Sequence, residues 1–211
     1  MQITNDCVYA LADSIFASGY PMRTKKPSTE EFYRAVAQIE MHMNKGEHDE
    51  NEHIKRAIRL ATTPMNSGHD NFLNGCIVHF DLDAPIKIWT EAQRYHFLDF
   101  VSSMSTMHRL KDFQLCSEGV ADSYVDHAIL MRLDDLQKRY HETGKKEDLL
   151  RLLLSAPVGL NLCARMVTNY RQLKTICRQR EGHRLPHWKV FIDWVQSLPM
   201  AVEFNLTGRD E

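Results

Sequence analysis

Apolar residues recur at the three- and four-residue spacing of an α-helix in several segments of the chain. Across 30–43 the apolar side chains fall on one helical face, after a Ser28-Thr29-Glu30 run that supplies a cap and a first-turn acid. The pattern predicts a helix there and at further places. These are 51–61, 122–141, 146–154 and 187–197, with one more helix that starts near Pro85 and runs toward His96.

Two segments, 77–83 and 160–166, alternate polar with apolar residues, as strands with one exposed face do. The Thr-, Pro- and Gly-containing stretch 62–68 breaks regular structure before the first strand and places His69 on a loop. Asn169 follows the second strand and begins another helix, which ends at Glu181-Gly182. We therefore expect a mixed architecture with several long helices in a single domain, 1–211.

Composition narrows the class of protein. With 211 residues, 43% hydrophobic and 26% charged, the chain can bury a sizeable core. A net charge of -2 argues against a protein that coats nucleic acid, but it leaves room for a small anionic ligand in a local basic pocket. The sequence has no apolar run long enough to cross a bilayer and no signal-peptide features at its start. We expect a cytoplasmic protein without membrane or nucleic-acid partners.

The cysteines and histidines do not indicate a disulfide framework or a metal site. The five cysteines are odd in number, scattered and without a C-x-x-C pair, so we expect reduced, mostly buried thiols, with Cys76, Cys163 and Cys177 in the core. His183 and His187 have helical ligand spacing, but Pro186 between them disfavours a continuous helix. We expect no bound metal.

The most informative segment is the helix that begins at Asn169 and ends near Arg180. Asn169 can cap the first turn or bind a ligand, and Arg171 offers a planar fork of donors suited to anions. Arg180 lies three turns from Asn169 on the same face, so its guanidinium either extends to solvent or enters a partly dry pocket. The alternative interpretation of the segment is a cap followed by solvated basic residues, which is also how we interpret Lys174 and Arg178.

Two blocks of residues resemble the flavin-dependent thymidylate synthases. In one, Gly68-His69, a strand and Ala84-Pro85-Ile86 are similar to the family's Gly-His-Glu, strand, Ala-Pro segment at the same spacing. In the other, Asn169-x-Arg171-x-Leu173, followed after six residues by Arg180 and then by Trp188, reproduces the family's spacing. The resemblance covers roughly the last two thirds of the chain.

The block between them departs from the family's Arg-His-Arg, seven residues and Ser. This chain has Arg94-Tyr95-His96, with Met104 at the expected serine, and a short insertion would bring Ser105 and Arg109 into place. Glu91 stands where the family commonly has a glutamine. The family's additional phosphate-binding arginine falls on Leu153, with Arg151 close but out of register.

The resemblance implies an α+β fold of the flavin-dependent thymidylate synthase type, with a mixed sheet, in a homotetramer whose sites lie between subunits. It implies bound FAD and reductive methylation of dUMP to dTMP, with methylenetetrahydrofolate as carbon donor and NADPH as reductant. In such enzymes the protein contributes binding, orientation and electrostatics.

The resemblance also assigns roles to individual residues. Arg180 is the expected catalytic residue, which holds the pyrimidine and favours its N3-deprotonated form. The expected FAD contacts are His69, Asn71, Arg94, His96, Asn169, Arg171 and Thr175. The expected substrate contacts are Glu91, Gln93, Arg94, Ser105, Arg109 and Arg180. Two hypotheses stay open: an active flavoenzyme acting on a pyrimidine nucleotide, and a flavin- or nucleotide-binding relative that modifies another nucleotide or has lost catalysis.

Overall fold

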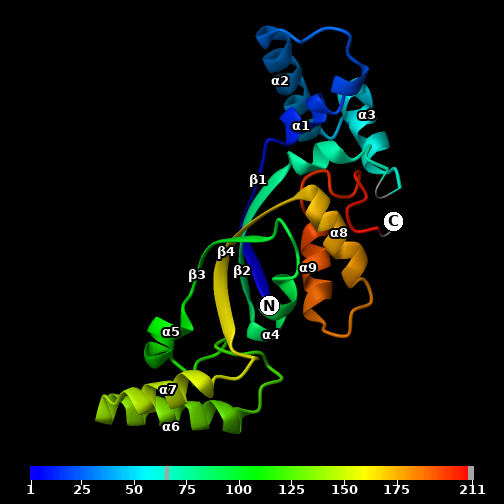
Figure 1. The fold of residues 1–211 in the computed structure, drawn as a ribbon. Coiled ribbons are helices and arrows are strands. Elements are labelled where there is room, and N and C mark those ends of the chain that lie inside the picture. Colours follow the sequence, from blue (N-terminus) through cyan, green and yellow to red (C-terminus); the bar gives the residue numbers. More distant parts are fainter. Residues whose placement is uncertain (65–66, 209–211) are drawn as a thin grey trace. The chain divides into compact units, whose positions relative to one another are not determined.

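The computed structural model describes residues 1–64 and 67–208, which form helices and one four-stranded sheet in the order β1-β2-β4-β3 (Figure 1). The strands are β1 (Gln2–Tyr9), β2 (Ile77–Pro85), β3 (Asp99–Ser103) and β4 (Asn161–Asn169). The helices are α1 (Leu11–Ala17), α2 (Thr29–Lys45), α3 (Glu52–Ala61), α4 (Ile86–Ala92), α5 (Thr106–Arg109), α6 (His127–Thr143), α7 (Lys146–Leu154), α8 (Tyr170–Arg180) and α9 (His187–Gln196). Short 3-10 turns η1 (Tyr20–Met22), η2 (His48–Glu50), η3 (Asn71–Asn74) and η4 (Leu110–Asp112) connect them.

The chain divides into two compact units. Unit 1 comprises Met1–Asn5 and Phe80–Met166, and unit 2 comprises Asp6–His79 and Val167–Glu211. Strands β1, β2 and β4 contribute residues to both units. The single domain expected from the sequence stays a prediction. Within the described residues, none of the helices combines the length and apolar character needed to span a bilayer.

Strands β2 and β4 run antiparallel. The Tyr170 N–H donates to the Cys76 carbonyl (3.0 Å), and the Ile86 N–H donates to the Leu160 carbonyl (3.0 Å). Each bond joins the start of one strand to the end of the other, which is the antiparallel register. The polar positions of this pair meet as well, since Arg165 Nη1 donates to Asp81 Oδ1 at 3.1 Å. The alternation in β2 is as predicted from Val78 onward, because Val78, Phe80, Leu82 and Ala84 are buried and the polar residues between them are partly exposed.

Unit 1 has its core where the antiparallel helices α6 and α7 pack together against η4 (Figure 1). Six leucines form this cluster: Leu110, Leu115, Leu133, Leu136, Leu152 and Leu160. The buried Gln137 amide donates to the carbonyls of Leu110 (3.0 Å) and Phe113 (2.8 Å), so its own donors are satisfied inside the core and it links α6 to η4. Gly144, at φ 60°, ends α6 in the left-handed conformation that favours glycine.

Unit 2 contains α1 to α3 together with α8 and α9. Helices α1 and α2 pack side by side, as do α8 and α9 (Figure 1). Arg56 of α3 donates to the Ile15 and Phe16 carbonyls in the last turns of α1, at 3.3 and 3.4 Å. Gly19 makes room for this arginine, since a Cβ there would lie 2.7 Å from its Cζ. The fully buried Ile15, Phe16 and Ile39 join the core around these contacts.

Most predicted elements are confirmed, with two boundary corrections. The helix predicted over 122–141 begins at His127, because Asp122 Oδ1 accepts the Tyr124 N–H (3.0 Å) in a turn and Asp126 caps the helix. The helix predicted to run toward His96 ends at Ala92, and Phe97 at φ 59° is incompatible with a continuing helix. Of the predicted break over 62–68, Met65 and Asn66 lie outside the described residues.

Asp148 of α7 provides a test of the α6–α7 packing. Its carboxylate is buried and accepts from Thr143 (2.7 Å), and it pairs with Arg139 (2.9 Å) and Arg151 (3.2 Å). The hydrogen bond from Thr143, with the two arginines, holds the pKa of Asp148 below its ordinary value. Such a group stabilises the fold above its unfolded-state pKa, and the contribution is lost as pH falls through the folded-state pKa.

We therefore expect Asp148→Asn to lower the melting temperature at pH 7 by about 5 °C. The difference from the parent should narrow as the pH falls below about 4. Thermal unfolding followed by circular dichroism between pH 3 and 7 measures this. Asp135→Asn, on the exposed side of α6, is the control and should leave the melting temperature unchanged. A pH-independent difference for Asp148→Asn would contradict the electrostatic account.

Candidate functional site

Asn169 begins α8 as the sequence predicts. Its backbone is extended and its Oδ1 accepts the Gln172 N–H at 2.8 Å, which satisfies one of the free donors of the first turn. The side chain is largely buried, with 8% exposed. Asn169 therefore has a structural role as an N-cap, and a ligand contact at this residue stays a prediction.

Arg171 connects α8 to the loop that contains His69. Its Nη1 donates to Asn71 Oδ1 at 2.7 Å, and its Nε lies 3.7 Å from Asp70 Oδ1. About a third of the arginine side chain is exposed, and His69 and Asn71 are exposed as well. The structure thus brings Asn71 and Arg171 together in unit 2, across 100 residues of sequence, at the end of α8 that Asn169 caps.

Lys174 is buried, which corrects the interpretation of this residue as part of a solvated basic face. Its side chain is 1% exposed, its Nζ lies 3.6 Å from Asp70 Oδ2, and it donates to the Ala61 carbonyl at the end of α3. Burial lowers the pKa of the Lys174 ammonium, and the Asp70 carboxylate opposes that shift. Arg178, in contrast, is exposed as expected.

The sequence contained a signal for the buried lysine. Tyr170, Leu173, Lys174 and Cys177 follow the i, i+3, i+4, i+7 spacing of a buried helical stripe, and all four are buried. A lysine in that register needs a counter-charge. Asp70 supplies the counter-charge, but it lies far from Lys174 in the sequence, so the sequence pattern alone does not reveal the pair.

Arg180 lies at the other end of α8. Its Cζ is 4.3 Å from the ring centroid of the buried Trp188, and its Nη1 is 3.1 Å from His183 Nε2. The guanidinium is therefore half-buried on an aromatic face, which is a favourable site for a cation. Arg180 lies nine positions after Arg171, or about 14 Å along the helix axis. Between them, the Thr175 hydroxyl donates to the Arg171 carbonyl at 3.1 Å.

Four further predicted residues lie at the end of α4 in unit 1. Glu91 is largely buried, and its Oε1 lies 3.3 Å from the Lys87 ammonium. Gln93 follows the helix and lines a cavity of about 460 Å³ that Trp89, Phe100 and Met104 also line. Arg94 and His96 are exposed in the turn that follows.

The predicted phosphate contacts in unit 1 already have local partners. Ser105 caps α5, where its Oγ accepts the His108 N–H at 3.3 Å. Arg109 is exposed and pairs with Asp112 at 3.6 Å. Arg151, near the family's phosphate-binding position, pairs with the buried Asp148, while Leu153 packs against the leucine cluster. The predicted residues therefore form two sets: the α8 set in unit 2, and the α4 and α5 set in unit 1.

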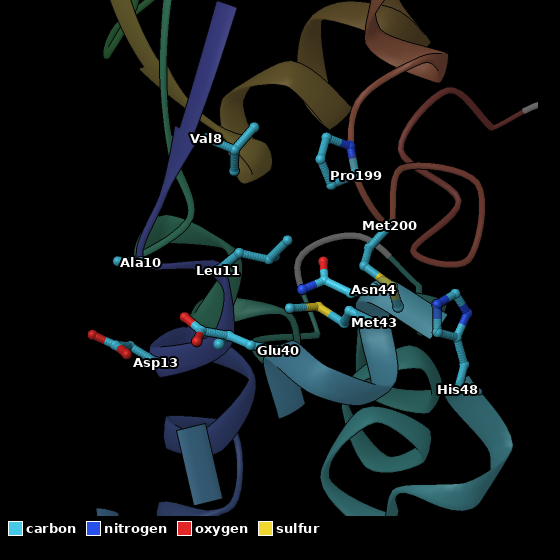
Figure 2. Close-up of a pocket in the computed structure, with 11 residues that line it drawn as sticks. Val8, Ala10, Leu11, Asp13, Glu40, Met43, Asn44, His48, Pro199 and Met200 are labelled. Carbon is cyan, nitrogen blue, oxygen red and sulfur yellow. The ribbon is translucent and has the colours of Figure 1, made fainter. Parts of the chain in front are cut away.

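A second cavity in unit 2, of about 610 Å³, contains none of the predicted site residues (Figure 2). The start of α1, the end of α2 and the segment at Pro199 and Met200 line it. Its ionisable side chains are Asp13, Glu40 and His48, and His48 Nδ1 lies 3.1 Å from Glu203 Oε1.

His183 and His187, which have helical ligand spacing in the sequence, do not share a helix, because α8 ends at Arg180 and α9 begins at His187. Helix α8 ends before His183, whose two ring nitrogens face the Arg180 guanidinium and the Leu185 N–H. Elsewhere in the described parts of the chain, His42, Glu47 and Glu50 have potential ligand atoms within 4.8 Å of one another. This group lies at the surface, where acidic clusters are common.

The architecture is that of the flavin-dependent thymidylate synthases, so the α+β fold predicted from the sequence is confirmed. A structure of flavin-dependent thymidylate synthase ThyX from Helicobacter pylori, complexed with FAD and dUMP, matches with a TM-score of 0.67 and 14% identity over 99% of both chains. A second ThyX structure from the same organism, also with FAD and dUMP, matches with a TM-score of 0.59 and 14% identity over 80% of this chain and 91% of that one. A scan of family models gives no match, and neither does a search of curated proteins.

The burial of the cysteines predicts which of them react with a thiol reagent. Cys76 and Cys177 are fully buried, and burial raises the pKa of Cys76 to about 12. Burial also raises the pKa of the half-buried Cys163, with Asp83 and Asp81 adding to the shift. Cys7 and Cys116 are exposed.

We expect a thiol reagent at pH 8 to label Cys7 and Cys116 in the folded protein, and Cys76 and Cys177 only after denaturation. Peptide mapping by mass spectrometry identifies the labelled residues. Rapid labelling of Cys76 in the folded protein would show a reactive thiol and contradict its assignment to the core.

Proposed function

We propose that this protein is a flavoenzyme of the thymidylate synthase type. The reaction is reductive methylation of dUMP to dTMP, with FAD as cofactor, methylenetetrahydrofolate as carbon donor and NADPH as reductant. The observation that supports it most directly is the Arg171–Asn71 bond beside His69, formed in a fold whose solved examples bind FAD and dUMP. Two residues of the resemblance, Asn71 and Arg171, are thus in contact, and this contact supports the proposal.

The residues around the head of α8 fit an anionic cofactor such as FAD. Arg171 and Lys174 supply two positive charges, and the buried Asp70 supplies one negative charge. The group therefore keeps one positive charge in a chain whose net charge is -2. His69, Asn71, Asn169, Arg171 and Thr175 are the unit 2 residues that would hold the cofactor. When bound, reduced flavin supplies the reducing equivalents of the reaction.

Arg180 is the proposed catalytic residue. A guanidinium stays protonated at any physiological pH, so beside a pyrimidine it lowers the cost of a negative charge on N3. The face of Trp188 restricts the guanidinium before the substrate arrives, and preorganised charge is the form of electrostatic stabilisation that acts on a transition state.

The α4 and α5 residues are the proposed substrate contacts. Arg94 would bridge flavin and nucleotide phosphate, and His96 would contact the flavin in place of the family's arginine. Gln93 and Glu91 would contact the nucleotide, and Ser105 and Arg109 its phosphate. To bind the nucleotide, Glu91 and Arg109 would have to leave their ion pairs with Lys87 and Asp112, or contact the ligand while still paired.

We also propose a cytoplasmic homotetramer with sites between subunits. Large apolar side chains are exposed on and beside the edge strand β3: Phe97, Phe100, Val101, Met104 and Met107. Several exposed apolar side chains along and beside one edge strand favour a protein interface. Nucleic acid and membranes are not among the proposed partners.

The second candidate is a flavin- or nucleotide-binding relative that modifies another pyrimidine nucleotide or has lost catalysis. The departures in the central motif favour it. Met104 lines a cavity where the family has a serine, and Arg109 and Glu91 are already paired. Binding and turnover measurements separate the two candidates.

The first experiment is reconstitution with FAD. We expect protein desalted after incubation with FAD to retain the flavin band near about 450 nm and to shift it on addition of dUMP, because stacking and charge alter the flavin spectrum. A flavin band without a dUMP response would favour the second candidate. Protein that retains no flavin would exclude the proposed cofactor and with it the proposed reaction.

Two arginine variants separate cofactor binding from chemistry. We expect Arg180→Ala to lower dTMP formation by about 100-fold or more while it retains FAD, because its proposed partner is the pyrimidine. Arg171→Ala should instead raise the Kd for FAD by about tenfold or more. The exposed Arg178→Ala on the same helix is the control and should change neither. Full turnover by Arg180→Ala would overturn the catalytic assignment.

A further inference from the structure

Asp70 and Lys174 form a buried ion pair beside the proposed cofactor site. Their side chains are 3% and 1% exposed, and Lys174 Nζ lies 3.6 Å from Asp70 Oδ2. Lys174 also donates to the Ala61 carbonyl, the last residue of α3, where the helix dipole favours a cation. Burying two charges costs free energy that a packed apolar pair would not require, so the pair calls for a reason beyond stability.

The pair is in direct contact with the predicted site. Asp70 lies between His69 and Asn71 in the chain, and Lys174 lies one turn after Arg171 on α8. The other oxygen of the same carboxylate, Asp70 Oδ1, is 3.7 Å from Arg171 Nε and has no hydrogen-bond partner among the described residues. One carboxylate thus faces cations from two successive turns of the helix.

The geometry separates two kinds of residue. Arg171 is a third exposed and also donates to Asn71, so these two side chains can reach a ligand. Asp70 and Lys174 are too deeply buried to touch one. Lys174 holds Asp70 in place, and Asp70 lies beside the guanidinium of Arg171.

We propose that Asp70 and Lys174 are positioning residues for the cofactor site, which act through Arg171 and Asn71. This inference rests on the proposed function, because it takes the ligand to be FAD. The carboxylate neutralises one of the two cations. An anionic group of the ligand is the second counter-ion, and the fixed loop presents His69 and Asn71 beside it.

Three variants test the inference: Asp70→Asn, Lys174→Met and the double variant. Counting Asp70, Arg171 and Lys174, the formal charge is +1 in the parent, +2 in Asp70→Asn, 0 in Lys174→Met and +1 again in the double variant. The double variant therefore restores the charge but not the pair. It should also recover much of the stability that either single variant loses, because it leaves no buried charge without a partner.

The measurement is the Kd for FAD, by quenching of flavin fluorescence, at a temperature where circular dichroism shows every variant folded. We expect Lys174→Met and the double variant each to raise the Kd by about tenfold or more. Lys55→Met, which removes an exposed cation of α3 paired with Glu52, is the matched control and should bind as the parent does.

The double variant decides between positioning and a purely structural or electrostatic role. A double variant that binds FAD within about twofold of the parent overturns the inference, since charge and stability alone would then account for binding. A parent that binds no FAD overturns the proposed function and this inference with it. A parent that binds FAD beside a weak-binding, folded double variant supports both.

Discussion

The antiparallel pairing of β2 with β4 is the constraint on which the rest of the structure depends. Its register places Cys76 against Tyr170 and Ile86 against Leu160, and so determines where each strand stops pairing and a helix starts. Strand β2 leads into α4, and β4 leads into α8, so the pair positions the predicted site residues that lie on these two helices. If β2 slipped by one residue, its buried face would turn outward, which is why its alternating burial fixes the register.

The sequence predicted the elements that have a strong local signal. Helix α7 matches its predicted bounds, and α2, α3 and α9 match within one or two residues, because apolar spacing and boundary residues agree there. The edge strands β1 and β3 were not predicted, since nearly all of their residues are exposed and an exposed strand has no burial pattern to reveal it. The turn at Asp122 was predicted as the start of a helix, because an aspartate side chain accepts backbone N–H groups both in turns and at helix N-termini.

Those features of the site that depend on neighbouring residues in the sequence could be predicted. Asn169 was expected as a cap, and its hydrogen bond to Gln172 lies within one turn. The burial of Lys174 and the stacking of Arg180 on Trp188 depend on segments that meet only in the folded chain. Periodicity alone places Lys174 in the core, but only the fold shows that Asp70 and the end of α3 make that position tolerable.

Arg171 and Arg180 lie on one uninterrupted helix, which limits how the length of the segment between them can vary. In an α-helix each residue adds a fixed rise and a fixed rotation, so the number of residues between two side chains sets their distance along the axis and their relative direction. Inserting one residue between the arginines would turn the second by about 100° and remove it from its present face. Substitutions within α8 can therefore change the side chain at either end, whereas an insertion or deletion between the two arginines would change their relative direction.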